Sequence, residues 1–438
     1  MVRRTPPDTL PWLLFISGLT LSFLLSAQAL LELGIPYDAP YGPMVAKLHP
    51  GSYLLILAWL AALLRHGNPL VVAARLARRQ PVLAAYMACM VLVFVWVVLR
   101  HGTSGAAYIV QTLWVPGFAL MTLPLLLPQR GHQTLVWLTA LLCLNALLAL
   151  AEYFGKFHLV PLPADQEGIQ YFRASAFLGH PLANANITMG LLPAALLMPW
   201  RLSLRVAALV LLVCSVLAFG ARTALGVGVA VYGTQLLFTL GARAVRGRYS
   251  YLQITGGCAA LLLGGTVLAA AVLSAGLGER IFSNLKWDNS ANVRLRVWDA
   301  FDYLQGADWW LGLPPTQIDR IAIAMGLDPR YEAIENFWVY AYLQFGLIGF
   351  VPFLLGLGCL VWLMLTRGAP VLRSAVLVFF IVASTANTLS SKTVSLTLLA
   401  VVLLASARPR ARPLPASPAS AWAPTRPMSR PEPSLGNP

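Results

Sequence analysis

The side chains that could do chemistry gather late in this sequence, between Leu277 and Phe350. Nine of the sixteen acidic residues lie there, while most of the remaining chain consists of apolar runs separated by short basic turns. The stretch ends in Glu335 and Asn336, and an apolar run from Phe337 to Thr366 follows at once. Glu335 is the first candidate for a general base. A structural role is equally open, because a negative charge is also favoured at a helix N-terminus.

Three arginines lie in segments that could meet this carboxylate. Arg222 follows Gly220 and Ala221 in a tight turn between two apolar runs, and Arg173 and Arg294 lie in polar segments before and after it. An arginine at the hydrocarbon centre costs about 2.5–3.5 kcal/mol, and less near the surface, so its presence needs a reason. Arg222 is either a snorkelling anchor or an anion ligand that faces a cavity, and we favour the anion ligand.

His180, Trp298 and Asn336 are candidates for a supporting role. His180 precedes a proline in the first polar segment and could equally be a turn or interface residue. Trp298 belongs to Val293–Gln305, whose apolar residues recur at helical spacing and predict a helix lying on the membrane or the bundle. Arg294 and Arg296 are two residues apart, or about 200° on a helix, so they cannot both face one ligand.

The elements that must position these residues are membrane helices. The chain is 58% hydrophobic and 11% charged, which indicates an all-α polytopic membrane protein rather than a soluble one. Its net charge of +15 does not indicate nucleic-acid binding, because membrane proteins keep excess Lys and Arg on their cytoplasmic side. The five cysteines lie inside apolar runs and have no metal-ligand spacing, so we expect neither disulfides nor a metal site.

About twelve apolar runs are long enough to predict transmembrane helices. They cover Pro11–Leu31, Gly51–Leu64, Pro81–Leu99, Ala106–Leu127, Thr134–Phe154, Ala183–Trp200, Leu204–Phe219, Thr223–Leu240, Tyr251–Ala275, Phe337–Thr366, Pro370–Ala386 and Leu389–Ala405. The run from Phe337 is too long for one upright helix, so either it is tilted or Gly346–Gly349 breaks it.

Charge sorting predicts that both termini are cytoplasmic. With the N-terminus inside, the short inner turns hold most of the arginines, as the positive-inside rule requires. The outer side then holds every acidic residue except Asp8 and Glu432. Pro69–Gln80 combines arginines with an apolar face and is predicted to lie on the inner surface. Ala27-Gln28-Ala29 could be a signal-peptidase site, but many spans follow, so we favour an uncleaved first helix.

These predictions divide the chain into four regions. Residues 1–276 form an N-terminal transmembrane bundle of about nine helices, and residues 277–336 form a large helical loop on the outer side. Residues 337–406 are C-terminal transmembrane helices. Residues 407–438, rich in Pro, Ser, Ala and Arg, cannot bury a core and are expected to be a disordered cytoplasmic tail.

Taken together, these segments resemble the bacterial O-antigen ligase and O-antigen or exopolysaccharide polymerase family, membrane glycosyltransferases with about a dozen helices and a large late periplasmic loop. The resemblance covers roughly Tyr171 to Phe350. Its motifs are an Arg-to-Asn segment, a Gly-x-Arg turn, an Arg-x-x-x-Trp segment before a Trp-Leu-Gly stretch, and Asn-aromatic before Gly-Leu-Ile-Gly. They correspond to Arg173–Asn186, Gly220–Arg222, Arg294–Trp298, Trp310–Gly312, Asn336–Phe337 and Gly346–Gly349.

The resemblance implies a fold like that of GT-C glycosyltransferases and an inverting transfer without metal or cofactor. The donor would be a glycan on undecaprenyl diphosphate at the periplasmic face of the bacterial inner membrane, and the acceptor a sugar hydroxyl. Arg222 and Arg294, with Arg173 as a third candidate, would bind the diphosphate, and Glu335 would act as the base. Other polysaccharide export or assembly proteins would be possible partners.

The chain departs from the family at the key position. Ligases carry His before the Asn, whereas this chain has Glu335, and no His lies in the long loop. This difference favours an exopolysaccharide or O-antigen polymerase over a lipopolysaccharide O-antigen ligase. A flippase or transporter for lipid-linked glycans would more often place ionisable residues within its spans, and a different membrane glycosyltransferase or a protein-glycosylating oligosaccharyltransferase also stays open.

Overall fold

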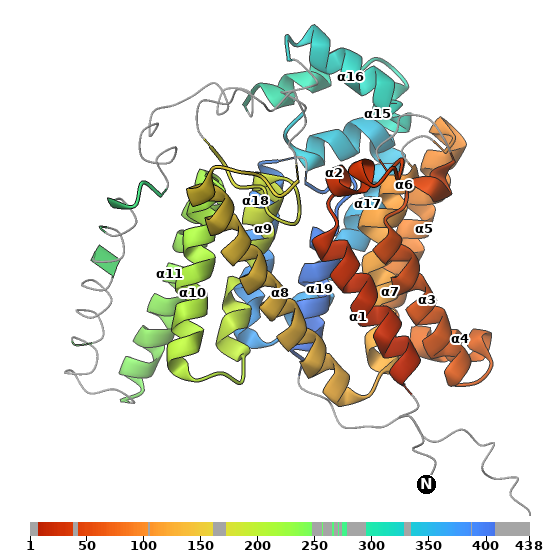
Figure 1. Ribbon diagram of the computed structural model, residues 1–438. Coiled ribbons are helices and arrows are strands. Elements are labelled where there is room, and N and C mark those ends of the chain that lie inside the picture. Colours follow the sequence, from red (N-terminus) through yellow and green to blue (C-terminus); the bar gives the residue numbers. More distant parts are fainter. Residues whose placement is uncertain are drawn as a thin grey trace, which may run out of the picture.

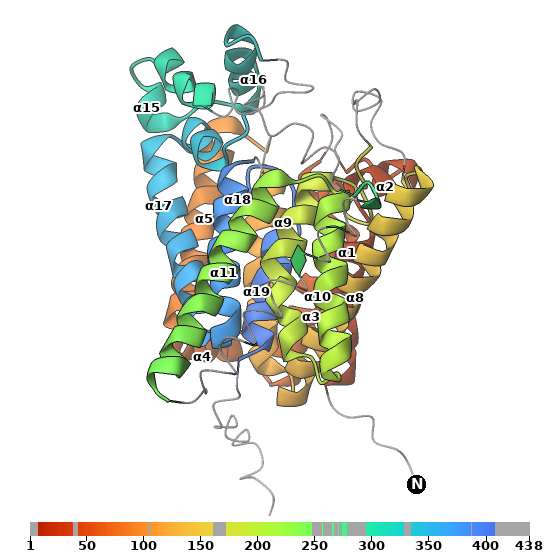
Figure 2. The same cartoon turned by 90° about the vertical axis from the view of Figure 1, so that its left-hand side faces the viewer.

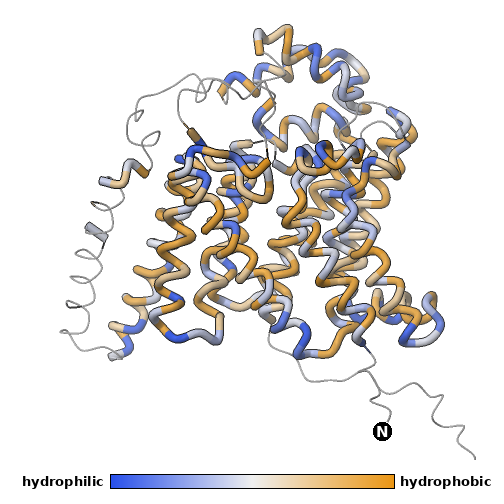
Figure 3. The backbone as a smooth tube through the Cα atoms, in the orientation of Figure 1, coloured by the Kyte–Doolittle hydropathy of each residue, from blue (hydrophilic) through white to orange (hydrophobic). Residues whose placement is uncertain are grey.

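A computed structural model of the chain describes residues 8–37, 43–103, 106–160, 172–247, 295–327, 334–386 and 388–407, together with 256, 265, 266, 270 and 274–277. Across these residues every regular element is a helix, and most helices run side by side between two ends of a bundle (Figure 1). Apolar residues dominate their middle parts (Figure 3). The expectation of an all-helical chain with the character of a membrane protein is therefore confirmed for this part.

Five described helices are long and apolar enough to cross a membrane. They are α5 (Pro81–His101), the continuous segment Ala106–Leu125 that includes α7 (Val115–Thr122), α8 (Pro128–Gly155), α11 (Arg222–Val245) and α17 (Phe337–Arg367). A bent pair, α3 (Pro50–Arg65) and α4 (Pro69–Arg79), turns through 101°. Shorter apolar helices are α1 (Thr9–Leu24), α9 with its 3-10 extension (Pro181–Leu197), α10 (Leu202–Ala218), α18 with its 3-10 start (Pro370–Ser384) and α19 (Ser395–Ala405).

Each predicted span that lies in the described residues contains one or more of these helices, although the boundaries differ. The predicted span Tyr251–Ala275 lies almost wholly outside the described residues, so the count of about twelve spans stays a prediction. The amphipathic segment Pro69–Gln80 does form a helix, α4, which lies at the lower right edge of the bundle (Figure 1).

The first apolar run is not one helix, contrary to expectation. Helix α1 ends at Leu24, and α2 (Ala27–Glu32) begins after Ser26, whose hydroxyl accepts a hydrogen bond from Ala29 N at 3.1 Å. The carbonyl of Leu25 is 2.8 Å from Nε2 of the buried His49. The break therefore has a local cap and a distant partner, and only the cap is visible in the sequence.

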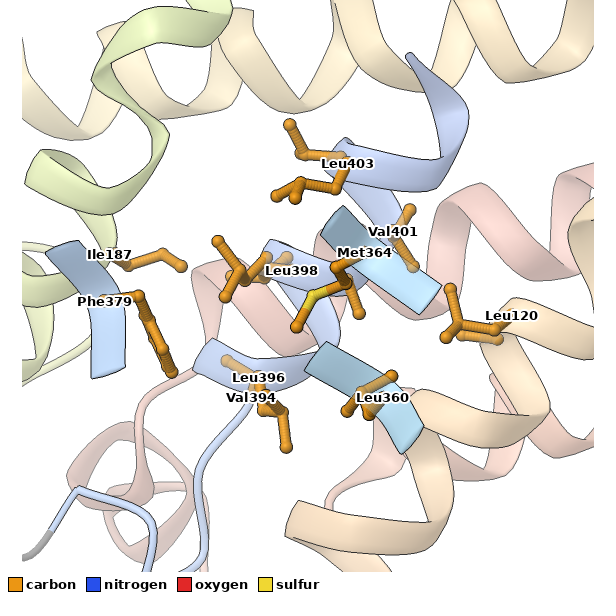
Figure 4. Close-up of a cluster of buried hydrophobic side chains, with 14 of the residues drawn as sticks. Leu120, Ile187, Leu360, Met364, Phe379, Val394, Leu396, Leu398, Val401 and Leu403 are labelled. Carbon is orange, nitrogen blue, oxygen red and sulfur yellow. The ribbon is translucent and has the colours of Figure 1, made fainter. Parts of the chain in front are cut away.

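The core centres on α19, which lies between two groups of helices (Figure 1). All residues from Leu396 to Leu403 are buried, so this helix is enclosed on every side. Figure 4 shows Leu398 and Val401 beside Met364 of α17, with side chains from α7, α9 and α18 around them. Helices that begin and end far apart in sequence are thereby held at fixed positions around one centre.

Arginines gather at one end of the bundle. The ends of α3, α4, α11 and α17 and the starts of α8, α10 and α18 meet there, where Figures 1 and 3 show the polar lower turns. The arginines at these helix ends are Arg65, Arg75, Arg78, Arg79, Arg130, Arg201, Arg205, Arg243, Arg246, Arg367 and Arg373. This end is called the arginine-rich end below.

A small helical cap covers part of the opposite end (Figure 2). It consists of a 3-10 helix (Val297–Tyr303), α15 (Asp308–Leu311) and α16 (Pro315–Ala324). Its core is Val297, Ala300, Leu304, Leu313, Ile318, Ile321, Ala322, Met325, Leu327, Ile334, Val339 and Leu343. The cap therefore rests on the first turns of α17.

The predicted apolar face of Val293–Gln305 is only partly correct. The 3-10 helix repeats every three residues, so Val297 and Ala300 point inward while Trp298 is 55% exposed. Arg296, directly before this 3-10 helix, donates from its guanidinium to the carbonyl of Met325 at the end of α16.

Helix α17 breaks at Gly346, one of the two outcomes expected for this run. Gly346 has φ of +58° and ψ of 179°, a conformation that favours glycine. Carbonyls released near the break find partners on α5: Trp96 Nε1 donates to Phe345 O at 2.8 Å, and His101 Nε2 lies 3.1 Å from Gln344 O. Leu313 N donates to Leu343 O at 2.7 Å and ties the cap to the break.

Replacing Gly346 by Ala should destabilise the protein. A Cβ atom there would lie closer than 3.0 Å to backbone atoms of Gly312 and Trp310, and the positive φ adds strain. We expect the free energy of unfolding to fall by more than about 1 kcal/mol, seen as a lower melting temperature in detergent. Gly358→Ala is the control, since nothing lies within 4 Å of its added Cβ and it should be neutral or stabilising. Equal melting temperatures for the two variants would contradict the prediction.

Candidate functional site

Three charged side chains predicted for the site line one cavity of about 110 Å³. They are Arg173, Arg222 and Glu335, and they come from three segments that are far apart in sequence. Much of the remaining wall is small or carries a hydroxyl, including Thr385 and Thr388. Many of its lining residues come from the start of α11 and the end of α18, and these two helix ends lie opposite the arginine-rich end (Figures 1 and 2).

Arg222 is placed by a tight turn between two helices. Helix α10 ends at Ala218, Gly220 takes φ of +65°, and α11 begins at Arg222 itself. The N-terminus of a helix is positively polarised by its backbone dipoles and free N–H groups. Ala221, which precedes α11, has no side chain that could cap it. The guanidinium and the helix end therefore present positive potential to the same cavity.

Arg173 is held against the same turn. Its Nε donates to the carbonyl of Phe219 at 3.0 Å, and Ala174 N donates to Ala218 O at 3.1 Å. These two bonds join the loop before α9 to the end of α10. Arg173 and Arg222 are thus brought to one cavity by main-chain geometry, although forty-eight residues separate them.

The loop that carries Arg173 is fixed by a buried carboxylate. Glu152, near the end of α8, has no exposed surface, and its Oε2 accepts hydrogen bonds from Ser175 N and Ala176 N at 2.8 and 2.9 Å. Its Oε1 accepts from Leu159 N at 2.9 Å. Ala176 has φ of +42°, a strained value for a non-glycine residue. The carboxylate therefore stabilises a backbone shape that the loop would not take alone.

Two buried asparagines extend this network. Asn145 on α8 donates to Oδ1 of Asn184 at 2.9 Å and accepts from Phe177 N at 3.0 Å. Asn184 in turn donates to the carbonyls of Ser175 and, at 3.1 Å, His180. Asn184, part of the motif quoted above, thus fixes the loop rather than facing the cavity.

Glu335 was considered either as a general base or as a structural residue at a helix N-terminus, and the neighbouring Asn336 takes the structural position. Asn336 is the cap: its Oδ1 accepts from Trp338 N at 3.0 Å and from Val339 N at 3.3 Å. Glu335, one residue earlier, lines the cavity with the arginines. Asn336 therefore supports the site by fixing where the chain enters α17.

The other predicted residues differ in their placement. His180 is the residue before α9 and lies near Arg173. Partial desolvation by the surrounding protein and the positive charge of Arg173 lower the pKa of His180. The residue nevertheless keeps exposed surface. Trp298 does not line the cavity and lies in the exposed cap. Arg294 lies outside the described residues.

Sequence reasoning missed Glu152 and Asn145. Both are polar residues within the apolar run Thr134–Phe154, where a buried charge is costly unless it is paired or hydrogen-bonded. That cost was the signal that could have identified them. Which loop they hold could not be read from the run itself.

Comparisons with protein-family models, with curated proteins and with solved structures gave no match. Two guanidinium groups can bind phosphate oxygens bidentately, and a carboxylate beside them can accept a proton from a hydroxyl. The arrangement suits a reaction in which a phosphorylated group leaves as a hydroxyl attacks.

Glu152→Gln should loosen the loop that carries Arg173. The amide can no longer offer two acceptor oxygens to three backbone N–H groups, and hydrogen bonds to charged groups are worth about 1.5–3 kcal/mol each. We expect hydrogen exchange at Ser175 and Ala176 to accelerate by at least about tenfold, measured by mass spectrometry. Glu32→Gln is the control, because Glu32 is exposed. Unchanged exchange in Glu152→Gln would show that the carboxylate does not hold the loop.

Proposed function

We propose that the protein is a membrane glycosyltransferase that moves a glycan from a lipid diphosphate to an acceptor sugar hydroxyl. The observation that carries the proposal is the meeting of Arg173, Arg222 and Glu335 in one cavity at an end of an apolar helical bundle. The resemblance to O-antigen ligases and polysaccharide polymerases implies diphosphate binding by Arg173, Arg222 and Arg294, and Glu335 stands where the ligases carry His. We favour a polymerase of exopolysaccharide or O-antigen.

The two arginines would bind the diphosphate. A guanidinium is planar and stays charged, so it can pair with phosphate oxygens throughout the reaction. Neutralising the diphosphate makes it a better leaving group. The resemblance assigns Arg294 to the same role together with Arg222, and Arg294 lies outside the described residues.

Glu335 would act as the general base. It would take the proton of the acceptor hydroxyl, whose oxygen attacks the anomeric carbon as the bond from that carbon to the diphosphate oxygen breaks. The lipid diphosphate leaves with the bonding electrons, and a single displacement inverts the anomeric configuration. The reaction as written uses no metal and no cofactor.

The two ends of the bundle support an orientation. We assign the arginine-rich end to the cytoplasm, according to the positive-inside rule. The cavity then opens toward the periplasmic face of a bacterial inner membrane, where undecaprenyl-diphosphate-linked glycans would be presented. About twelve spans in a GT-C-like arrangement, with both termini inside, complete this proposal.

Glu335→Gln should lower transfer by about 10²–10⁴-fold, the usual contribution of a general base. The substitution keeps the size of the side chain and removes its basicity. The measurement is the rate of glycan transfer from a purified lipid-diphosphate donor in liposomes. Asp302→Asn, on the exposed face of the cap, is the matched control and should keep normal activity. Normal transfer by Glu335→Gln would exclude a carboxylate base.

Arg222→Lys should weaken donor use although it keeps the positive charge. Lysine cannot bind two phosphate oxygens in the fixed geometry of a guanidinium. We expect kcat/KM for the donor to fall by at least about tenfold. Arg243→Lys, at the far end of α11, should be neutral. Equal kinetics for the two variants would remove Arg222 from the proposed site.

Polymerase and ligase can be separated with one donor. Wild-type protein given only a lipid-diphosphate-linked repeat unit should produce a ladder of longer lipid-linked chains on a gel. Product only after addition of lipid A core would favour the lipopolysaccharide ligase instead. No product in either condition, with donor moved across the liposome membrane, would favour a flippase.

A further inference from the structure

One hydroxyl in the wall of the candidate cavity has no partner within the described part of the chain. Thr388 lies in the turn after α18, lines the cavity and is 8% exposed. Its hydroxyl makes no hydrogen bond to another described residue. A hydroxyl that is removed from water costs free energy unless it finds a partner. Because Thr388 is more than nine-tenths buried and borders the cavity, a molecule in the cavity can supply that partner.

The position of Thr388 is fixed by its neighbours. Ala386 and Leu389 are 7% and 2% exposed, and Leu389 belongs to the apolar core of the bundle. Thr385, in the same turn, differs from Thr388, because its hydroxyl donates to the carbonyl of Val382 at 2.8 Å. That bond ties the turn to the end of α18. A donor that is held in place before a ligand arrives loses little entropy when the ligand binds.

The start of α11 borders the same cavity. Arg222 is its first residue, and Thr223 and Ala224, which follow, also line the cavity. The first N–H groups of a helix have no partner within the helix, and Ala221 provides no side-chain cap. Helix N-termini and threonine hydroxyls are common partners of phosphate oxygens. Uncharged donors that suit an anion therefore line the same cavity as the guanidinium groups.

We propose that Thr388 and the first turn of α11 bind a second phosphate, so that the cavity selects a diphosphate carrier over a monophosphate carrier. A sugar on a lipid monophosphate offers two non-bridging oxygens, whereas a sugar on a lipid diphosphate offers four. The arginines pair with the oxygens of one phosphate, and the hydroxyl and N–H groups donate to those of the other. Holding both phosphates orients the leaving group, a role that rests on the proposed function.

Isothermal titration calorimetry of the full-length protein in detergent can test this with farnesyl diphosphate and farnesyl phosphate, which differ by one phosphate. Wild-type protein should bind the diphosphate at least about tenfold more tightly. Thr388→Val keeps the shape of the side chain and removes its hydroxyl. The affinity for the diphosphate should therefore fall by at least about tenfold, while the affinity for the monophosphate changes little. Thr388→Ser, which keeps a hydroxyl, should retain most of the preference.

The control is Thr239→Val, an exposed position on α11 outside the cavity wall, which should bind both lipids as wild type does. Equal affinities of wild-type protein for the two lipids, or an unchanged diphosphate affinity in Thr388→Val, would overturn the proposal. The wild-type comparison decides where Thr388→Val fails to fold. A preference that depends on Thr388, without glycan transfer by wild-type protein, would support the phosphate subsite and contradict the transferase. Transfer without that preference would contradict the subsite alone.

Discussion

The candidate site depends on one buried carboxylate. Glu152 lies within the bundle, and it is tolerated there because three backbone N–H groups donate to it. Two of those donors, Ser175 N and Ala176 N, belong to the loop before α9, and Ala176 itself has a strained backbone. Without the carboxylate, these N–H groups would have to find other acceptors near an apolar bundle, at a cost of about 1–3 kcal/mol each. The shape of the loop, and with it the position of Arg173, follows from this balance.

Breaks in the helices obey the same constraint at other places. A helix in an apolar surrounding must satisfy each backbone group that a break releases. At Gly346 the partners are Trp96 and His101 of α5, and at Leu25 the partner is His49. Each of these two breaks is therefore matched by polar side chains from another part of the chain. The chain also changes direction between α10 and α11, and Gly220 and Arg222 of that turn line the candidate cavity.

The sequence predicts the helices well and their interruptions poorly. Run length and composition locate the apolar helices, because burying apolar surface requires a continuous stretch. The break after Leu24 was missed, because its partner His49 lies far along the chain. The inward face of residues 297–303 was misjudged, because a 3-10 repeat replaces the α repeat that the spacing suggested.

The residues of the candidate site were easier to select than their supports. Arg173, Arg222 and Glu335 stand out because charges are rare in this chain, and the structure places them around one cavity. Their chemical roles remain predictions. Glu152 and Asn145 act through backbone groups of a loop that no local pattern connects to α8. Such support depends on tertiary contacts and becomes visible only when the chain is folded.

The electrostatics of the cavity follow from how the helices are arranged around it. Helices α9, α11 and α17 all begin at this end, and Leu182, Arg222 and Glu335 at their starts line the cavity. Each helix start is positively polarised, and the side chains add two positive charges and one negative charge. The balance is positive, so an anion would be favoured over a neutral sugar. A diphosphate meets that condition, and it would place the bond to be broken beside the one carboxylate among the residues that line the cavity.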